Sequence, residues 1–354
     1  MTISITVKDL EYDLPKGCIA THPVSPRSSA KLLVVENETF LHKTVSDLAS
    51  LLPENALLVV NETAVLPARF KTKRAITGGI GEGLFLKQHG SIWEVMLKSN
   101  GKLRKGVLLE LQNDIQLELL ERVGKNWMCT CSDTRDAREI LQEIGTTPIP
   151  PYILGARGDS KTDDLQDREH YQTVYADTTQ NFSVAAPTAG LHFDEQLLLE
   201  LETKGIQRVP VTLHVGPGTF KSIETPTIEE HEMHEENWEV CQASLDAIKE
   251  AKVAGRPVIA IGTTSVRTLE SLPPLSEWPE RGGLSGATSL MIAPPYDFNL
   301  VDGMLTNFHL PKSTLLTLVA AMIGMNTLKS AYAEAIGSGY RFYSYGDAMF
   351  FLSQ

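Results

Sequence analysis

The chain has 354 residues, of which 44 are acidic and 32 basic, so its formal net charge is −12. With 42% hydrophobic and 21% charged residues, the composition is that of an ordinary globular chain and excludes collagen-like, disordered and disulfide-scaffold proteins. The length predicts two domains, and the acidic total argues at first against a nucleic-acid partner, because phosphate backbones are bound by Lys and Arg.

The first residues, MTISITVKDL, lack the basic and apolar regions of a secretion signal. The most apolar stretch, residues 315–324, is far shorter than the about 20 residues of a membrane span, so we expect a buried helix there. No CxxC pair occurs among the four cysteines. We therefore predict a cytoplasmic protein with reduced thiols.

The chain begins with an α/β pattern. Residues 31–35 form a short apolar run, and residues 56–60 (ALLVV) predict a strand that is buried on both faces. The polar residues 61–63 follow that strand at its carboxyl end, where sites of α/β proteins usually form.

The pattern of apolar and turn-forming residues changes after Arg69. Short strand-like runs alternate with turn signals, and this spacing predicts a small antiparallel barrel or sandwich. The runs are residues 83–87, 92–97, 107–111, 115–120 and 127–131. A helix over 133–144 and a proline-rich return over 146–151 close the segment, so we predict an inserted β-barrel domain over residues 69–147.

Beyond residue 151 the α/β pattern returns. Asp194 is expected to cap a helix that runs to Lys204, and Ser244 to cap a second one. The remaining expected elements are strands over 206–215, 258–261 and 341–345 and helices over 312–323 and 327–336. The fold class that follows is α/β, with a discontinuous main domain of residues 1–68 and 148–354.

Two glycine-containing segments carry polar residues in unusual number. Residues 183–193 (SVAAPTAGLHF) hold Thr188, Gly190 and His192, a histidine that could move protons near neutral pH. Residues 213–220 (LHVGPGTF) end an expected strand with four more candidates, which are His214, Gly216, Gly218 and Thr219. The competing interpretations are a tight strand-to-helix connection and a hairpin turn.

The run HEMHEE at residues 231–236 resembles half of a zinc site. Its two histidines are three residues apart, whereas the zinc pattern HExxH needs four, and the sequence offers no third ligand. We therefore predict no metal site, and we expect His234 to make a polar contact with a ligand.

A third arrangement begins where the strand over 258–261 ends. Gly262, Thr263, Thr264 and Ser265 bring hydroxyl and backbone N–H groups to a helix N-terminus, which favours anionic or ribose-like groups. Arg267, expected in the first turn, adds a positive charge. The alternative is ordinary capping, with Arg267 paired to the acid three residues later.

The last two segments lie near the C-terminus. Residues 306–314 include Asn307, His309 and Lys312, a basic residue whose place at a helix start calls for an acidic neighbour. Residues 340–347 (YRFYSYGD) surround Arg341 with aromatics, a pattern that suits base stacking and a core strand almost equally.

Taken in order, five of these motifs resemble one family, the S-adenosylmethionine:tRNA ribosyltransferase-isomerases of queuosine biosynthesis. The motifs are SVAAPTAGLHF, LHVGPGTF, GTTSVRTLES, TNFHLPKSTLL and YRFYSYGDAM, preceded by YDLP, NET, PAR and YQTVY. The resemblance covers residues 12–349. It implies transfer of the ribosyl part of S-adenosylmethionine to 7-aminomethyl-7-deazaguanine at the tRNA wobble position, giving epoxyqueuosine, adenine and methionine. It also implies an α/β domain with an inserted barrel and a cosubstrate, with no permanently bound cofactor. We expect the chain to be a monomer.

This chemistry needs a base beside the sulfonium and contacts for both substrates. The candidate catalytic residues are His192, His214, His309 and Asp347. The candidate substrate-binding residues are Thr188, Gly190, Gly216, Gly218, Thr219, His234, Gly262, Thr263, Thr264, Ser265, Arg267, Asn307, Lys312, Arg341 and Tyr345. Arg267 and Thr263 could hold either the ribose or the methionine carboxylate.

Two rival functions stay open. A methyltransferase or another S-adenosylmethionine-dependent tRNA-modifying enzyme would use the same cosubstrate but leave adenosylhomocysteine. A non-catalytic tRNA-binding protein would release no adenine.

The acidic total hides an uneven distribution. Residues 64–127 hold 11 basic and 6 acidic side chains, a net charge of +5, which leaves −17 for the rest of the chain. The inserted barrel is therefore the predicted tRNA-facing surface. Its candidate contacts are Arg69, Lys71, Lys73, Arg74, Lys102, Arg104 and Lys105.

Overall fold

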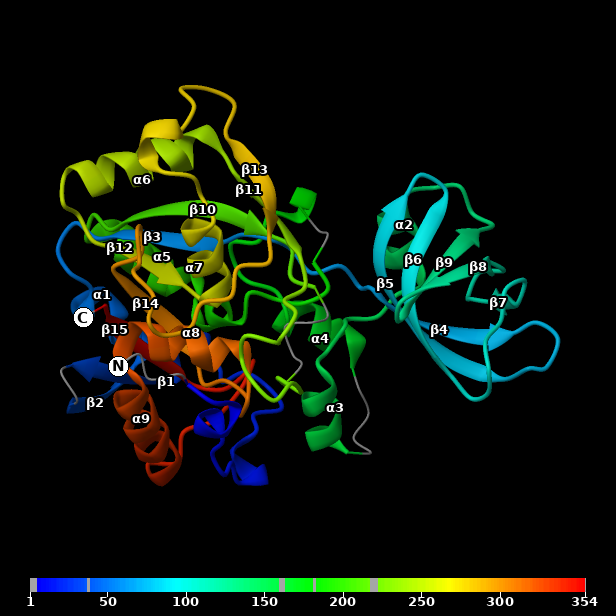
Figure 1. Cartoon of the computed structure of the whole chain (residues 1–354), viewed down its shortest axis with the longest axis horizontal. Coiled ribbons are helices and arrows are strands. Elements are labelled where there is room, and N and C mark those ends of the chain that lie inside the picture. Colours follow the sequence, from blue (N-terminus) through cyan, green and yellow to red (C-terminus); the bar gives the residue numbers. More distant parts are fainter. Residues whose placement is uncertain (1–4, 37–38, 159–162, 181–182, 217–221, 354) are drawn as a thin grey trace.

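The computed structural model describes residues 5–36, 39–158, 163–180, 183–216 and 222–353. Two bodies are visible, a large α/β part built on one sheet and a smaller β-barrel beside it (Figure 1). The predicted fold class, α/β with an inserted antiparallel barrel, is confirmed.

The large sheet is mixed and draws strands from both halves of the chain. In spatial order, its nine strands are β13 (Leu284–Thr288), β11 (Glu236–Val240), β10 (Gln207–Leu213), β3 (Leu57–Asn61), β12 (Val258–Ile261), β14 (Gly303–Asn307), β15 (Ala348–Leu352), β1 (Lys31–Glu36) and β2 (Thr39–Thr44). The central run β10, β3, β12 and β14 is parallel, so the carboxyl ends of these strands meet at one edge of the sheet.

Helices cover the sheet on both faces, which explains the continuous apolar runs of the central strands. Leu57 and Val59 of β3 belong to a core that includes residues of α6 (Gln242–Val253), α7 (Thr263–Glu270), α8 (Thr314–Ile323) and α9 (Met325–Gly337). Leu58 and Val60 belong to the opposite core, with α1 (Leu48–Leu51), α5 (Glu195–Thr203) and the 3-10 helix η6 (Thr188–His192).

The barrel is a closed ring of six strands in the order β4 (Arg69–Arg74), β5 (Ile80–His89), β6 (Ile92–Ser99), β9 (Asn126–Cys131), β8 (Gln116–Val123) and β7 (Leu108–Glu110). Its core contains Phe70 and Trp93 and continues into helix α2 (Ala137–Ile144). A Cβ atom at Gly83 would collide with the ring of Phe70, so this glycine is required for packing. The chain enters and leaves the barrel at neighbouring points, since Arg69 and Thr146 form an antiparallel bridge. Helices α3 (Pro151–Arg157) and α4 (Asp164–His170) follow.

Two local expectations are wrong. The final strand is β15, whereas residues 341–345 form a turn in which Tyr343 has a positive φ of 73°. Helix α6 is preceded by Cys241, and the hydroxyl of Ser244 instead donates to the carbonyl oxygen of Pro210 at 2.6 Å. The predicted cap Asp194 is confirmed, since its carboxylate accepts from the N–H of Leu197 at 3.0 Å.

In the described part of the chain, no single helix has the length and apolar character needed to cross a membrane. Helices α8 and α9 reach that threshold only when counted together, and a bend of 112° separates them.

Candidate functional site

The candidate site lies at the carboxyl ends of the parallel strands, where α/β folds usually bind ligands. Asn61 ends β3, Gly262 follows β12 and Asn307 ends β14. Two hollows open there. Leu315 of α8 lines both of them, and α7 contributes Thr263 and Thr264 to one and Arg267 to the other.

The first, which we call the polar hollow, encloses about 400 Å³ with the solvent at its mouth included. Its wall comes from four of the motif segments identified in the sequence. The lining residues are Ala186, Pro187, Thr188, Ala189, Val215, Gly262, Thr263, Thr264, Thr306, Asn307, His309 and Leu315. The predicted residues Thr188, Gly262, Thr263, Thr264, Asn307 and His309 are thus brought together.

Hydrogen bonds fix one side of the polar hollow. The hydroxyl of Thr188 donates to the side-chain oxygen of Asn307 at 3.0 Å, and the amide of Asn307 donates to the carbonyl of Tyr343 at 3.0 Å. His309 Nε2 lies 2.9 Å from the hydroxyl of Thr306. Burial lowers the pKa of His309 to about 3, so its ring is uncharged at neutral pH.

The start of α7 forms the other side. Gly262 has a φ of 87°, a left-handed conformation that glycine adopts without a steric cost, and α7 begins at the next residue. Thr264 is 9% exposed, and its hydroxyl has no hydrogen-bond partner among the described residues. The hollow therefore combines a helix N-terminus with an unsatisfied hydroxyl.

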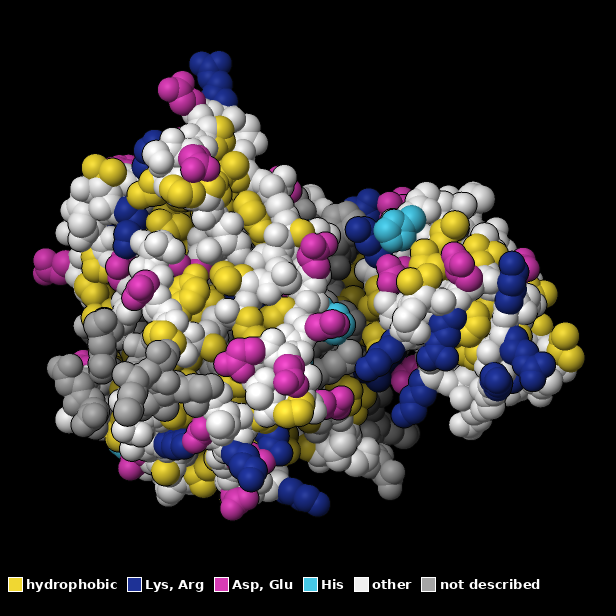
Figure 2. Space-filling model, viewed as in Figure 1, with side chains coloured by type: hydrophobic (Ala, Val, Ile, Leu, Met, Phe, Trp, Pro, Cys, Tyr) yellow, Lys and Arg dark blue, Asp and Glu magenta, His cyan; other side chains and the backbone are white. Residues whose placement is uncertain are grey.

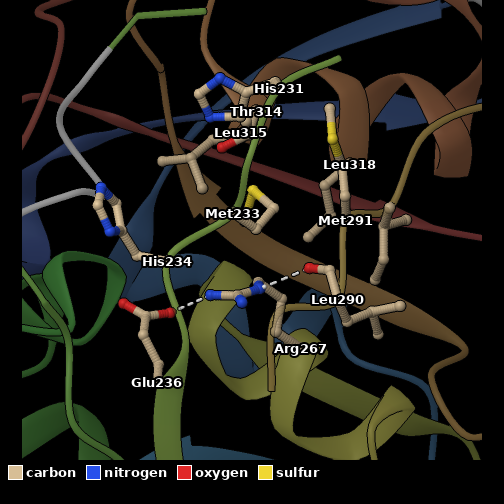
Figure 3. A pocket seen from close by; sticks show the side chains of 11 residues that line it. His231, Met233, His234, Glu236, Arg267, Leu290, Met291, Thr314, Leu315 and Leu318 are labelled. Atoms are coloured by element: carbon tan, nitrogen blue, oxygen red, sulfur yellow. Dashed lines mark hydrogen bonds and ion pairs between the residues drawn. The ribbon is translucent and has the colours of Figure 1, made fainter. Parts of the chain in front are cut away.

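The second, which we call the methionine-lined hollow, combines apolar side chains with a charged pair. Figure 3 shows Met233, Met291 and Leu290 around one space, with Arg267 and Glu236 at one end. The other lining residues are His231, His234, Ile292, Thr314, Leu315 and Leu318. His234 and Arg267, both predicted as binding residues, thus lie here rather than in the polar hollow.

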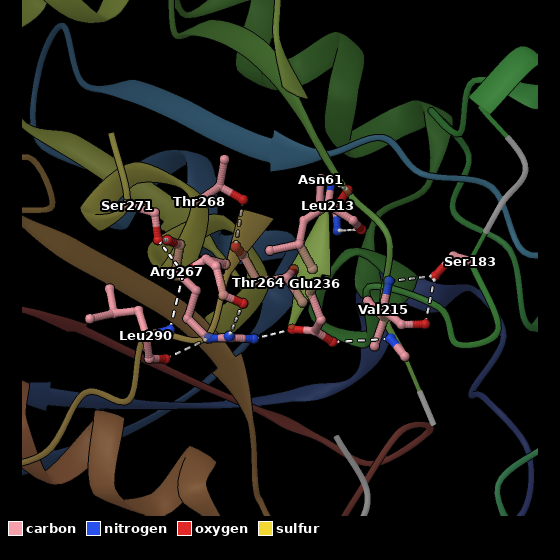
Figure 4. Close-up of polar contacts among 12 residues, drawn as sticks. Asn61, Ser183, Leu213, Val215, Glu236, Thr264, Arg267, Thr268, Ser271 and Leu290 are labelled. Carbon is pink, nitrogen blue, oxygen red and sulfur yellow. Dashed lines mark hydrogen bonds and ion pairs between the residues drawn. The ribbon is translucent and has the colours of Figure 1, made fainter. Parts of the chain in front are cut away.

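Arg267 neither lies in the expected first turn nor pairs with the partner that the alternative interpretation named. It lies in the second turn of α7 and forms a buried ion pair with Glu236 of β11, not with Glu270 (Figure 4). Its Nε also donates to the carbonyl of Leu290 at 3.1 Å. The carboxylate of Glu270 accepts backbone N–H groups of residues 299–301 instead.

A buried polar scaffold holds the strand ends behind the hollows (Figure 4). The side chain of Asn61 donates to the carbonyl of Leu213 at 3.0 Å and accepts from the N–H of Leu213 at 3.1 Å. Ser183 accepts from the N–H of Val215 at 3.0 Å. His214 follows this strand end, its Nδ1 lies 3.0 Å from the hydroxyl of Thr63, and burial lowers its pKa.

His192 and Asp347 lie in a different cluster, at the other end of η6, whose last residue is His192. His192 is buried with Nδ1 3.0 Å from the carbonyl of Ala189 and Nε2 3.0 Å from that of Gly346, and burial lowers its pKa. Asp347 accepts from the N–H groups of Lys31 and Arg341 and pairs with the Arg341 guanidinium at 3.1 Å. These contacts join chain segments and leave both side chains engaged with the fold.

Five other predicted residues lie around the hollows rather than in their walls. Lys312 pairs with Glu11 at 2.6 Å, which supplies the expected acidic neighbour. The remaining four pack or bond behind the site, and they are Gly190, Gly216, Ser265 and Tyr345. Gly218 and Thr219 lie outside the described residues.

Basic side chains gather on the barrel (Figure 2). The exposed ones among those predicted are Lys71, Lys73, Lys102, Arg104 and Lys105. Arg69 and Arg74 are half-buried and donate to the carbonyls of Ile149 at 2.9 Å and Gly101 at 2.7 Å.

The structure adds residues that the sequence did not single out. Glu236 was visible only as the end of the HEMHEE run, although the alternating burial of β11 places its side chain inside. Met233, Met291 and Thr306 resembled ordinary core or strand residues. Among the described residues, no group of three or more His, Cys, Asp or Glu side chains could hold a metal ion.

Comparisons with known proteins agree on one family. Residues 7–351 match the family model described as queuosine biosynthesis protein. A relative named S-adenosylmethionine:tRNA ribosyltransferase-isomerase from Desulfitobacterium hafniense is 41% identical over 98% of this chain and 99% of its own. Relatives with the same name from Aromatoleum aromaticum and Thermotoga petrophila are 41% and 38% identical over 98% of this chain, and the match spans 98% and 99% of their own lengths. A crystal structure of the S-adenosylmethionine tRNA ribosyltransferase from Thermotoga maritima is 30% identical, with a TM-score of 0.54 over 97% of this chain and 100% of that one.

Proposed function

The chain belongs to the queuosine biosynthesis protein family, and from this membership we propose the reaction and the role of each part of the site. The protein is an S-adenosylmethionine:tRNA ribosyltransferase-isomerase, as its relatives are named. The acceptor is 7-aminomethyl-7-deazaguanine at the wobble position of tRNA. The products are epoxyqueuosine in tRNA, adenine and methionine.

One observation carries the placement of the reaction. Residues from four separated motif segments line the polar hollow, at the sheet edge where α/β folds bind ligands. The adjoining methionine-lined hollow offers apolar surface along the same helix, α7. S-adenosylmethionine has both a charged amino-acid end and a large adenosyl part, so two adjoining hollows that each offer polar and apolar side chains fit it.

The reaction removes a proton beside the sulfonium, so an unprotonated base must face the cosubstrate. His309 lines the polar hollow and is uncharged at neutral pH, because burial lowers its pKa to about 3. It is our candidate for direct contact with the reacting groups, as a hydrogen-bond partner rather than as a cation. His214, held against Thr63, is the second candidate.

His192 and Asp347 have a different role in this proposal. Their polar atoms are bound to backbone groups on both sides, so we assign them as positioning residues that hold η6 and the turn before β15. The barrel over residues 69–147, with its exposed lysines and arginine, is the proposed tRNA-facing domain. The chain is proposed to act as a monomer and without a permanently bound cofactor.

Incubation with S-adenosylmethionine and tRNA carrying the deazaguanine precursor tests the reaction. We expect adenine and methionine in solution and a mass gain of the ribosyl-derived group on the wobble nucleoside. Adenosylhomocysteine would instead identify a methyltransferase, and tRNA binding without adenine release would identify a binding protein. The variant His309→Ala should lose most turnover while keeping its circular-dichroism spectrum, with Thr268→Val on the same side of the sheet as the control.

A further inference from the structure

Resting on the proposed function, we propose that the carboxylate of S-adenosylmethionine binds in the polar hollow at the N-terminus of α7, with the Thr264 hydroxyl as a donor, and not on Arg267. The adenine end of the cosubstrate then extends along α7 into the methionine-lined hollow. This assigns an orientation to the cosubstrate and a specificity role to a threonine.

Arg267 is the obvious partner for a carboxylate, but its charge is already matched. Its guanidinium and the carboxylate of Glu236 are 7% and 4% exposed, and they pair directly (Figure 4). Nε donates to the carbonyl of Leu290 at 3.1 Å, and a terminal nitrogen donates to that of Thr288 at 3.4 Å. A ligand carboxylate would have to displace Glu236 and leave a buried charge without its partner, which is costly.

Thr264, in contrast to Arg267, has a polar group that is not satisfied within the described part of the fold. The residue lines the polar hollow, and its hydroxyl is buried with no hydrogen-bond partner among the described residues. A buried donor without a partner costs free energy that a ligand acceptor can return. Thr264 is the second residue of α7, so its side chain lies beside the first-turn N–H groups.

The helix start itself favours an anion. The N–H groups of the first turn have no acceptor within the helix, and the helix dipole places partial positive charge there. The described lining of the polar hollow contains no acidic side chain that would repel a carboxylate. Its one titratable member, His309, is uncharged at neutral pH and offers a hydrogen bond instead.

The spacing along α7 connects the two hollows. Thr264 and Arg267 are three residues apart, which places them on one face of the helix about 4.5 Å apart along its axis. A ligand anchored at Thr264 therefore reaches the space between Met233 and Met291 within one turn (Figure 3). There its apolar part meets thioether and leucine side chains, and the neutral pair Glu236–Arg267 bounds it.

The test compares two ligands on three proteins by titration calorimetry. S-adenosylmethionine and its decarboxylated analogue share the sulfonium, the ammonium and the adenosyl group, and they differ only in the carboxylate. The native chain should prefer S-adenosylmethionine, and Thr264→Val should weaken its binding about tenfold while changing that of the analogue less than twofold. Thr268→Val is the matched control, because its hydroxyl donates to the carbonyl of Thr264 within the helix at 3.0 Å and lies outside the hollow's lining.

Two further variants keep the proposal open to refutation. Thr264→Ser retains the hydroxyl and should retain the preference. The paired change Glu236→Gln with Arg267→Met removes the ion pair and should also retain it. Equal weakening of both ligands by Thr264→Val, or loss of the preference in the paired variant, would overturn the assignment. If the native chain releases adenine from S-adenosylmethionine and Thr264→Val keeps the full preference, the subsite is wrong and the proposed function stands. If the native chain releases none, the proposed function itself fails.

Discussion

Glu236→Gln is the change with the clearest consequence for the stability of the α/β part. The substitution keeps the shape of the side chain but removes the charge that faces Arg267. Because both side chains are almost fully enclosed, at 4% and 7% exposure, solvent cannot replace the lost partner. Breaking a buried ion pair from one side typically costs about 3–5 kcal/mol, and we expect about 3 kcal/mol because glutamine still accepts the N–H of Gly216.

Urea unfolding followed by tryptophan fluorescence measures this loss. Trp238 and Trp278 are buried in the α/β part, so replacing Trp93 and Trp127 of the barrel by Phe restricts the signal to them. The paired variant Glu236→Gln with Arg267→Met removes both charges and should recover most of the loss. Glu143→Gln, in an exposed pair with Arg135, serves as the surface control and should change nothing measurable.

Two results would refute the reasoning. If Glu236→Gln left the unfolding midpoint unchanged, the pair would not be buried in solution. If the paired variant were as unstable as the single one, the cost would come from packing or from the lost backbone contact rather than from an unpaired guanidinium.

Three more predictions follow from the pKa of His309, the barrel charges and one close contact. The pKa of His309 is about 3 in the folded chain and about 6.5 when the side chain is exposed. As the pH drops below about 6.5, the unfolded chain therefore binds a proton before the folded chain does, and the free energy of unfolding falls. Between pH 7.5 and pH 5.5 the native chain should lose about 1.4 kcal/mol more stability than the His309→Gln variant, and equal losses in urea unfolding would contradict this. Three charge reversals on the barrel should weaken tRNA binding and reduce its dependence on salt concentration in a filter-binding assay. As a control, reversal of Lys249, an exposed lysine on α6, should leave the affinity unchanged. If the barrel reversals also left the affinity unchanged, the tRNA would bind to another surface. The reversed residues are Lys102, Arg104 and Lys105. Gly190→Ala should cost about 1–3 kcal/mol, because its Cβ would collide with the hydroxyl of Tyr175, and a thermal melt should show partial rescue by Tyr175→Phe.

The sequence predicted the elements whose signals are local. The strands β3 and β12 were visible as unbroken apolar runs because both faces of the sheet are covered by helices. Asp194 was recognisable because a cap acts on the next few residues. The barrel followed from the turn dipeptides between its short strands, since hairpin geometry depends on those turns.

Contacts between residues far apart in the sequence could not be predicted in this way. The pairing of Arg267 with Glu236 joins residues 31 positions apart on different elements, so the acid at position 270 was the only partner that helical spacing suggested. The aromatic segment before β15 resembled a strand, but it forms a turn in which the carboxylate of Asp347 accepts the N–H of Arg341, and the strand begins only at the next residue. Among the candidate residues, the sequence could not separate those of the polar hollow, such as His309, from buried positioning residues such as His192, because both are histidines in polar motif segments and the residues around them come from segments far away in the sequence.

The strand order of the large sheet has a consequence for how the chain is made. Strand β1 pairs with β15, so Leu32 lies opposite Ala348, and β15 lies inside the sheet rather than at its edge. During synthesis β1 can pair with β15 only after residues 348–352 have emerged, whereas the barrel, made of neighbouring hairpins, can close early. The loss of residues 348–352 would therefore remove an interior strand and leave the large sheet open.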